Sequence, residues 1–362
     1  MSFLGNTLRS MTALLSSQAI NAMAGLLLVP IFLARWSSQE YGEWLAVTSL
    51  GSAVTWLDFG ISNAGLNELA SEHGRGNHTR YREVQAILTK FFLLVAGVAL
   101  ALVAVTGAWL PLREWLNVHR MSRGALWSVL VLFSARFLLV LPASQIISAY
   151  RTTGNMARTT WAWNWISLLT HLLVLLALWW SGSPVVVAAM YPLALALGSG
   201  VVIVDLWNAR TGFLPVPTRG HWALLVPMLP AAIQFSAISI ASFMTLHGSL
   251  LVVSYSLGAV AVAQFSVVRT VSNVPQQVTR LIIAALWPEI TLLGSRGTDN
   301  RLARLHYAVS GIAICLSAAV GGWLWFAGDF VVGIWTSGQV PVQPGLLHIL
   351  IAIGIPGVTG RA

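Results

Sequence analysis

Two long apolar runs separated by a short turn decide the fold class. Residues 159–180 read TTWAWNWISLLTHLLVLLALWW and residues 184–204 read PVVVAAMYPLALALGSGVVIV, and neither run contains Asp, Glu, Lys or Arg. A helix needs roughly 20 mainly apolar residues to cross the hydrocarbon core of a bilayer. The runs also lack the strict alternation of barrel strands. They therefore predict membrane-spanning helices.

The composition of the whole chain has the same character. Of its 362 residues, 57% are hydrophobic and only 9% are charged, whereas a typical soluble domain has about 25% charged residues. A soluble globule of this size could not bury that much apolar surface. The composition predicts an all-α polytopic membrane protein. It argues against a soluble enzyme, a disordered chain and a nucleic-acid-binding module.

The same length criterion predicts about ten spans along the chain. They are 12–34, 42–66, 87–110, 124–149, 159–181, 184–207, 222–254, 259–288, 305–327 and 345–358. The last run is short because the sequence stops inside it. We therefore expect either a chain that is truncated at its C-terminus or an incomplete second lobe.

The basic residues predict the orientation in the membrane. The chain has 20 Lys and Arg against 11 Asp and Glu, and the basic residues lie mainly in alternate loops, such as the one with Arg75, Arg80 and Arg82. Cytoplasmic loops of membrane proteins carry the excess of Lys and Arg. This predicts a cytoplasmic N-terminus, with the run 12–34 as the first span and not a cleaved signal peptide.

A weak internal repeat predicts two lobes. The spacing of Glu68, Arg75 and Gly76 recurs in Glu289, Arg296 and Gly297. Six predicted spans separate the copies, so the copies share one orientation, as in transporters with parallel repeats. We expect a six-helix N-terminal lobe at 1–207, a cytoplasmic connector at 208–221 and an incomplete C-terminal lobe at 222–362. A central cavity would lie between the lobes.

A polar stripe in the eighth predicted span suggests a substrate site. Arg269, Asn273, Gln276 and Arg280 recur at helical spacing on one face, and the other faces are apolar. A buried arginine costs at least about 2.5 kcal/mol in a bilayer, so the stripe is expected to face water or an anion. Guanidinium groups match phosphate oxygens in geometry. The alternative is structural pairing with carbonyl groups, or Arg280 reaching the membrane surface.

Four further residues are candidates in other spans. Arg136 lies in the middle of the span 124–149 and serves either a substrate path or a structural pair. Gln18 and Asn21 lie on the first span. Asp58 lies inside the second span, where it either couples transport to an ion or caps a helix break at Leu57–Gly60.

Known catalytic patterns do not occur in the sequence. There is no Walker A loop, no Gly-x-Ser-x-Gly elbow and no His, Cys, Asp and Glu cluster at metal-ligand spacing. The sequence therefore predicts no catalytic residues, no metal, no cofactor and no enzymatic activity.

A diffuse set of motifs carries a resemblance to a known family. The motifs are Val29-Pro30, Leu33-Ala34-Arg35, Glu40-Tyr41-Gly42-Glu43-Trp44, Leu57-Asp58-Phe59-Gly60-Ile61, Gly74-Arg75-Gly76-Asn77 and Ala285-Leu286-Trp287-Pro288-Glu289. Together with the span layout, they resemble polysaccharide biosynthesis proteins of the O-antigen flippase type. These flippases belong to the multidrug/oligosaccharidyl-lipid/polysaccharide exporter superfamily.

The resemblance implies a function and a location. It implies two lobes that work by alternating access and move a lipid-diphosphate-linked oligosaccharide of lipopolysaccharide or exopolysaccharide biosynthesis across a bacterial inner membrane. It also implies that cavity arginines engage the diphosphate, a role that Arg269 and Arg280 are placed to match. Other polysaccharide assembly proteins are possible partners, besides the lipid bilayer, and nucleic acid is not expected.

Two other functions remain open from the sequence. A cation-coupled multidrug exporter of the same superfamily would favour carboxylates in its cavity, and Asp58 is the one acid well inside a predicted span. A membrane-embedded polysaccharide polymerase or glycosyltransferase would need a large outer loop with catalytic groups. The longest predicted outer loop, around 328–344, holds only Asp329.

Overall fold

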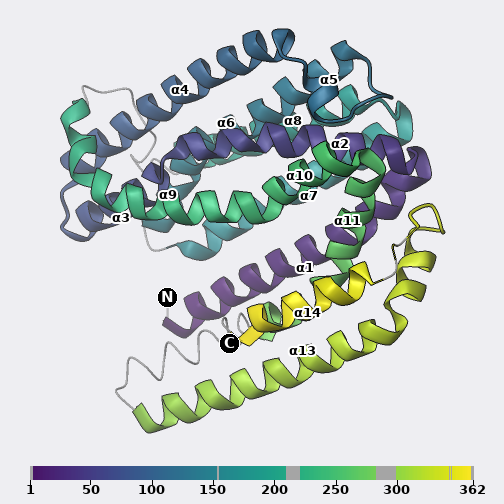
Figure 1. Cartoon of the computed structure of the whole chain (residues 1–362). Coiled ribbons are helices and arrows are strands. Elements are labelled where there is room, and N and C mark those ends of the chain that lie inside the picture. Colours follow the sequence, from purple (N-terminus) through teal and green to yellow (C-terminus); the bar gives the residue numbers. More distant parts are fainter. Residues whose placement is uncertain are drawn as a thin grey trace. The chain divides into compact units, whose positions relative to one another are not determined.

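The computed structural model describes residues 3–152, 155–208, 221–282, 299–341, 343 and 345–359. All regular structure in these ranges is helical (Figure 1). Seven segments are long and apolar enough to cross a membrane, and the bent pair Ser38–Asp58 and Ile61–Gly74 makes up to eight. The predicted all-α fold of a multi-pass membrane protein is confirmed.

Most described helices overlap the predicted runs, but two runs are not continuous α-helices. The run 42–66 is broken after Asp58, and the run 222–254 contains a 3-10 segment (Trp222–Met228) and a π-helical turn (Met244–Gly248). The run 259–288 begins as α11 (Ala259–Ser272) and is helical again over 274–282, while 283–288 lie outside the described residues. The last run is α14 (Leu346–Thr359), whose 14 residues are too few for a complete span.

The chain divides into two compact units. The large unit is Gly42–Ala259, and the small unit combines Met1–Tyr41 with Val260–Ala362. The predicted connector lies almost wholly outside the described residues. The predicted lobes at 1–207 and 222–362 therefore stay a prediction.

The large unit contains most of α2 and all elements up to α10. They are α2 (Ser38–Gly51), the 3-10 helix η1 (Ser52–Asp58), α3 (Ile61–Gly74), α4 (His78–Trp109), α5 (Leu112–Trp115), α6 (Arg123–Thr152), α7 (Met156–Trp180), α8 (Pro184–Asn208), η2 (Trp222–Met228), α9 (Leu229–Phe243), the π-helical turn η3 (Met244–Gly248) and α10 (Ser249–Leu257).

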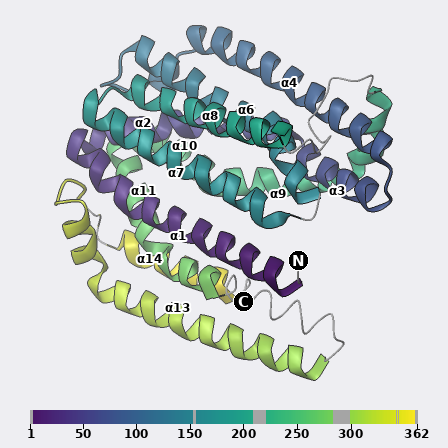
Figure 2. The same ribbon diagram turned by 180° about the vertical axis from the view of Figure 1, so that it is seen from behind.

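Helix α6 is the centre of the large unit, since it packs against both α4 and α8, and α7 pairs with α8 (Figure 2). Fully buried side chains from three helices meet there, including Ile147, Ile166 and Leu195. A side chain at Gly198 would overlap Ile166. Small residues of this kind let membrane helices approach closely. Close packing matters in a bilayer, because lipid tails provide no hydrophobic driving force for helix association.

The described residues of the small unit form four helices and the short helical segment 274–282. They are α1 (Phe3–Arg35), α11, α13 (Asp299–Trp335) and α14. Helices α13 and α14 lie side by side (Figure 1). The end of α13 is tied to α1 by a hydrogen bond of 2.7 Å from the indole N–H of Trp335 to the carbonyl of Leu26.

A buried carboxylate joins two segments of the large unit that are distant in sequence. Glu43 of α2 is fully buried. Its carboxylate accepts backbone N–H groups from His119, Arg120 and Met121, at 2.7, 2.7 and 2.9 Å. Three donors on one carboxylate satisfy a group that would otherwise be costly to bury.

The loop held by Glu43 also holds the end of α10. The Asn117 side-chain amide donates to the carbonyls of Ser254 and Tyr255 at 2.9 and 3.0 Å, and the Ser254 hydroxyl donates to the carbonyl of Leu116 at 2.7 Å. The Arg113 guanidinium donates to the carbonyls of residues 118 and 119 at 3.4 and 3.2 Å. We call Glu43, the loop 116–121 and residues 254–255 the Glu43 anchor.

Substitution of Glu43 tests this anchor. In Glu43→Ala, three backbone N–H groups lose their acceptor, and we expect the free energy of unfolding to fall by about 3 kcal/mol. Glu83→Gln is the matched control, because Glu83 forms only a half-exposed ion pair with Arg80 at 3.6 Å, worth at most about 0.5 kcal/mol. Thermal unfolding in detergent measures both. Equal melting temperatures for the two variants would contradict the anchor.

Candidate functional site

The predicted polar stripe lies in the small unit, on α11 and the helical residues that follow it. The backbone of this segment keeps its register, because Asn273 N–H donates to the carbonyl of Arg269 and Gln277 N–H donates to that of Asn273, both at 3.0 Å. The apolar faces hold buried valines, including Val267 and Val268. The stripe and the buried face are therefore separated as the helical spacing predicts.

The accessibility of the stripe increases along its length. Arg269, Asn273 and Gln276 are half-buried, and Arg280 is exposed. Such a gradient suits a polar surface that leads from the protein interior outward. The arrangement agrees with the alternative in which Arg280 reaches toward a membrane surface, and it leaves Arg269 as the arginine that the protein encloses more.

Aromatic residues surround Arg269. Its guanidinium lies over the ring of Phe265, 5.3 Å from the ring centroid, and Tyr41 is near enough to interact with it electrostatically. The ring of Tyr41 packs in turn on Phe32 of α1, with centroids 5.6 Å apart. Cation–π contact stabilises a cation that has lost part of its hydration. Phe265 and Tyr41 therefore stabilise the positive charge of Arg269, and the ring of Phe265 orients its planar guanidinium.

The first span contributes polar groups of different accessibility. Gln18 is half-buried on α1, and Asn21 is exposed on the same helix. Both belong to the small unit, as does the stripe.

Asp58 and Arg136 belong to the large unit. Asp58 is the last residue of η1, and its carboxylate accepts the backbone N–H of Ser62 at 3.0 Å. Phe59 and Gly60 follow with φ angles of 47° and 69°, and the helix axis turns by 42° there. A side chain at Gly60 would overlap the backbone of Ala232 in α9. The carboxylate thus caps the helix break that the sequence predicted.

A second irregular helix packs against this break. Phe243, at the end of α9, lies edge-on to Trp56 at 4.7 Å and stacks on His247 at 5.5 Å between centroids. His247 lies in the π-helical turn η3. Within the described part of the chain, the buried Trp56 indole nitrogen has no hydrogen-bond partner. Single π-helical turns and 3-10 segments inside longer helices often occur at functional sites.

Arg136 lies in α6 beside Tyr191 of α8, which interacts with it electrostatically. Its Nη1 atom is buried and has no hydrogen-bond partner among the residues that the structure describes. A buried donor of a cation without an acceptor needs water or an anion nearby. This keeps Arg136 a candidate for contact with an anionic ligand.

Metal binding has no basis in the described ranges, where no group of three or more His, Cys, Asp and Glu residues could hold an ion.

The arrangement of helices is similar to that of solved transporters. An inward-facing multidrug resistance MATE family transporter of the MOP superfamily matches with a TM-score of 0.64 at 14% identity, over 96% of this chain and 79% of that one. An outward-facing MATE family transporter matches with a TM-score of 0.58 at 16% identity, over 98% and 80%. The chain has the fold of MATE family transporters.

A third structural neighbour is a MOP superfamily transporter from Pyrococcus furiosus. The reverse polarity of the binding pocket of that protein is reported to suggest a different function for it. It matches with a TM-score of 0.55 at 14% identity, over 98% of this chain and 79% of that one. No protein-family model matches the chain, and no curated protein matches it in sequence. The fold agrees with the superfamily that the sequence resembles, and the O-antigen flippase specificity stays a prediction.

The structure also shows polar groups that the sequence reasoning passed over. Asp205 near the end of α8 accepts the hydroxyl of Tyr150 and pairs with Arg158 at 2.9 Å, while the Arg158 guanidinium lies 5.0 Å from the centroid of the Tyr150 ring. The sequence did contain a signal for this pair. Asp205 lies at the end of the predicted span 184–207, and Arg158 lies directly before the preceding span, 159–181. Glu43 had no such signal, because its partners are backbone atoms.

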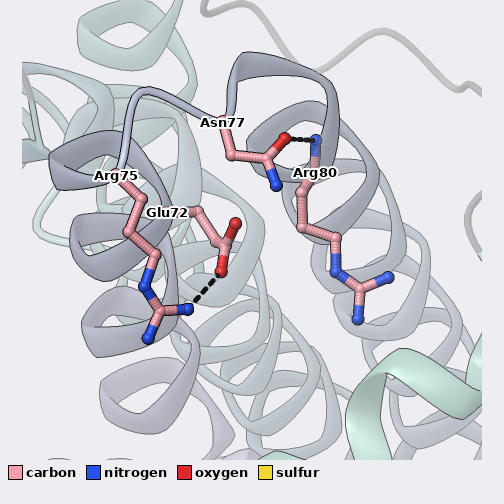
Figure 3. Close-up of polar contacts among 4 residues, drawn as sticks. All are labelled: Glu72, Arg75, Asn77 and Arg80. Carbon is pink, nitrogen blue, oxygen red and sulfur yellow. Dashed lines mark hydrogen bonds and ion pairs between the residues drawn. The ribbon is translucent and has the colours of Figure 1, made fainter.

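The basic loop after the second predicted span is an ordered turn between α3 and α4 (Figure 3). The Asn77 side chain accepts the backbone N–H of Arg80 at 3.2 Å and caps α4. Arg75 pairs with Glu72 at 3.0 Å, and its side chain stays 70% exposed. The charge of this turn is therefore presented to solvent, as expected for a loop at a membrane surface.

The two interpretations of Asp58 can be separated by its variants. Asp58→Ala removes the acceptor for Ser62 N–H, and we expect it to lower the free energy of unfolding by about 1 kcal/mol. Asp58→Asn keeps an oxygen acceptor and should cost less than half of that. Denaturation in detergent measures the difference. If Asn at this position abolished ion-dependent transport without a loss of stability, a coupling role would replace the capping role.

Proposed function

We propose that the chain moves a lipid-diphosphate-linked oligosaccharide from the cytoplasmic to the outer leaflet of a bacterial inner membrane by alternating access. The observation that carries the proposal is the arginine-bearing stripe of α11 and residues 274–282, set in a fold shared with MATE family transporters. Solved neighbours of this fold occur in inward-facing and outward-facing conformations. The fold therefore supports transport between two open states.

The charge of the candidate residues favours an anionic substrate. Arg269 and Arg280 lie on one helical stripe, and Arg136 in the large unit has a buried donor without a partner among the residues described. A guanidinium binds two phosphate oxygens at once through parallel N–H donors. A diphosphate brings several such oxygens, so it suits these groups better than a cationic drug does.

Polar amides on the stripe would serve the sugar. Asn273 and Gln276 lie between the two arginines and are half-buried. Amide side chains both donate and accept hydrogen bonds, as sugar hydroxyls require. Gln18 and Asn21 of α1 offer the same chemistry in the same unit.

The transport step follows from the chemistry of the two parts of the substrate. The arginines neutralise the diphosphate, which lowers the cost of moving it through a low-dielectric region. The lipid tail remains in the bilayer, so only the head group needs a polar path. The distribution of basic loops is the basis for placing the N-terminus in the cytoplasm. The proposed protein partners are other polysaccharide assembly proteins.

A cation-coupled multidrug exporter is the second candidate, because MATE family neighbours include multidrug resistance transporters. Such a mechanism favours carboxylates that are free to exchange a cation. Glu43, Asp58 and Asp205 already have hydrogen-bond or ion-pair partners in the structure. Their engagement is the reason we place this function second.

The proposal predicts a loss of transport when the stripe loses its inner arginine. We expect Arg269→Ala to lower the rate at least about tenfold, since a charge-assisted hydrogen bond contributes about 1.5–3 kcal/mol. The transport rate of Arg269→Lys should lie between those of the parent and Arg269→Ala, because an ammonium keeps the charge but lacks the planar arrangement of donors. The measurement is movement of a fluorescent lipid-diphosphate-linked glycan across reconstituted liposomes.

Arg304→Ala is the matched control, because Arg304 is an exposed arginine on α13. Parental transport by a monodisperse Arg269→Ala protein would disprove the assigned role. Efflux of a cationic dye driven by an ion gradient, without movement of the glycan lipid, would favour the exporter instead.

A further inference from the structure

The large unit contains an apolar cavity with a volume of about 550 Å³ that the proposed transport path does not use. It lies between α2, η1, α4, α6 and α10, next to α5, and its walls include Leu50, Val103, Leu130 and Leu251. Cavities that hold small ligands usually measure about 300–1,000 Å³. The cavity is therefore large enough for a ligand.

Two of the three hydroxyl-bearing side chains that line this cavity donate to backbone carbonyls. The Thr106 hydroxyl donates to the carbonyl of Leu102 at 2.7 Å, and the Ser134 hydroxyl donates to that of Gly51 at 3.4 Å. Most of the other lining residues are aliphatic, so the lining offers few of the two to four polar partners that an ordered water needs. The walls suit a hydrocarbon chain.

A smaller polar cavity, with a volume of about 290 Å³, adjoins the apolar one. Three residues line both cavities, namely Gly107, Leu110 and Leu112. The polar cavity is also lined by Arg113, Glu114 and Arg123. The two arginines outnumber the single carboxylate, so this cavity favours an anion.

Both arginines are held in place by backbone carbonyls. Arg123 donates to the carbonyl of Ala108 at 2.7 Å, and Arg113 belongs to the support of the Glu43 anchor. A guanidinium has five N–H donors, so each side chain keeps donors for a phosphate. A fixed guanidinium loses less entropy when it binds than a mobile one does.

Tryptophans mark the depth of the polar cavity in the membrane. Trp109 ends α4 and lines the polar cavity, with 83% of its surface exposed, and Trp115 of α5 lines the apolar cavity with 48% exposed. Exposed tryptophans of membrane proteins gather at the level of lipid head groups. The polar cavity then lies at the head groups, and the apolar cavity extends into the hydrocarbon.

We propose that these joined cavities bind one anionic phospholipid of the bilayer. Its phosphate lies between Arg113 and Arg123, and one acyl chain fills the space lined by Val103 and Leu130. None of the residues that line these cavities is a candidate substrate-binding residue. The lipid rests against the loop of the Glu43 anchor and the end of α10, and it stabilises the packing of these segments.

The head-group half of the proposal is tested by native mass spectrometry of the detergent-purified chain. Phosphatidylglycerol and phosphatidylcholine with identical acyl chains are titrated separately. We expect one phosphatidylglycerol to bind at least tenfold more tightly than phosphatidylcholine. Arg123→Gln should remove most of this difference, Arg123→Lys should retain part of it, and Glu114→Gln should increase it.

Arg120→Gln is the control for the head group. It removes an exposed arginine three residues before Arg123, and Arg120 itself lines neither cavity. Equal losses in Arg120→Gln and Arg123→Gln would overturn the site, since they would show attraction to surface charge alone. Equal binding of the two lipids would also overturn it. Displacement of the lipid by glycerol phosphate at the same concentration would show an ion site instead.

A matched pair on α4 tests the chain half. Val103 lines the apolar cavity, whereas Val105 is 61% exposed on the same helix and lines neither cavity. We expect Val103→Phe to fill the cavity and to lower phosphatidylglycerol binding at least fivefold, and Val105→Phe to leave it unchanged. Equal affinities for the two variants, with unchanged melting temperatures, would overturn the proposal.

Discussion

The packing of the large unit depends on one carboxylate. Glu43 holds the N–H groups of residues 119–121, and the same loop holds the end of α10 through Asn117 and Ser254. Three helices that lie far apart in sequence are thereby fixed at one end. Hydrogen bonds of this kind are stronger in a low-dielectric interior, and the cost of leaving them unmade rises equally. The walls of the apolar cavity beside α5 belong to the segments that this contact positions.

The hydrophobic pattern was sufficient to predict where the helices lie, because each membrane span must satisfy its own backbone and stay apolar over a fixed length. One of the two interpretations of Asp58 was a helix break there, since an acid that can cap a helix lies two residues before Gly60. The π-helical turn at Met244–Gly248 was not predictable in this way. Its residues include threonine and glycine, which favour helices only weakly but also occur in regular helices, so they do not specify a π-helical turn.

The candidate site was predictable in part. Helical spacing placed Arg269 and Asn273 on one face, and the structure keeps this face apart from the buried valines. Helical spacing does not predict how deeply a side chain is buried or which side chains contact it. The aromatic residues beside Arg269 were therefore found only in the structure. The role of Glu43 was missed because it depends on backbone amides 76 to 78 residues further along the chain. Such partners leave no side-chain signature.

The contact of Asp205 with Tyr150 and Arg158 has a mechanical consequence. It joins the C-terminal ends of α6 and α8 to the start of α7, and the same three helices pack along their length around Ile166. These helices are thus held together by an ion pair at one end and by the buried cluster around Ile166. Regular α-helical hydrogen bonding is interrupted elsewhere in the large unit, by the 3-10 helix η1 in the second predicted span and the π-helical turn η3 in the seventh.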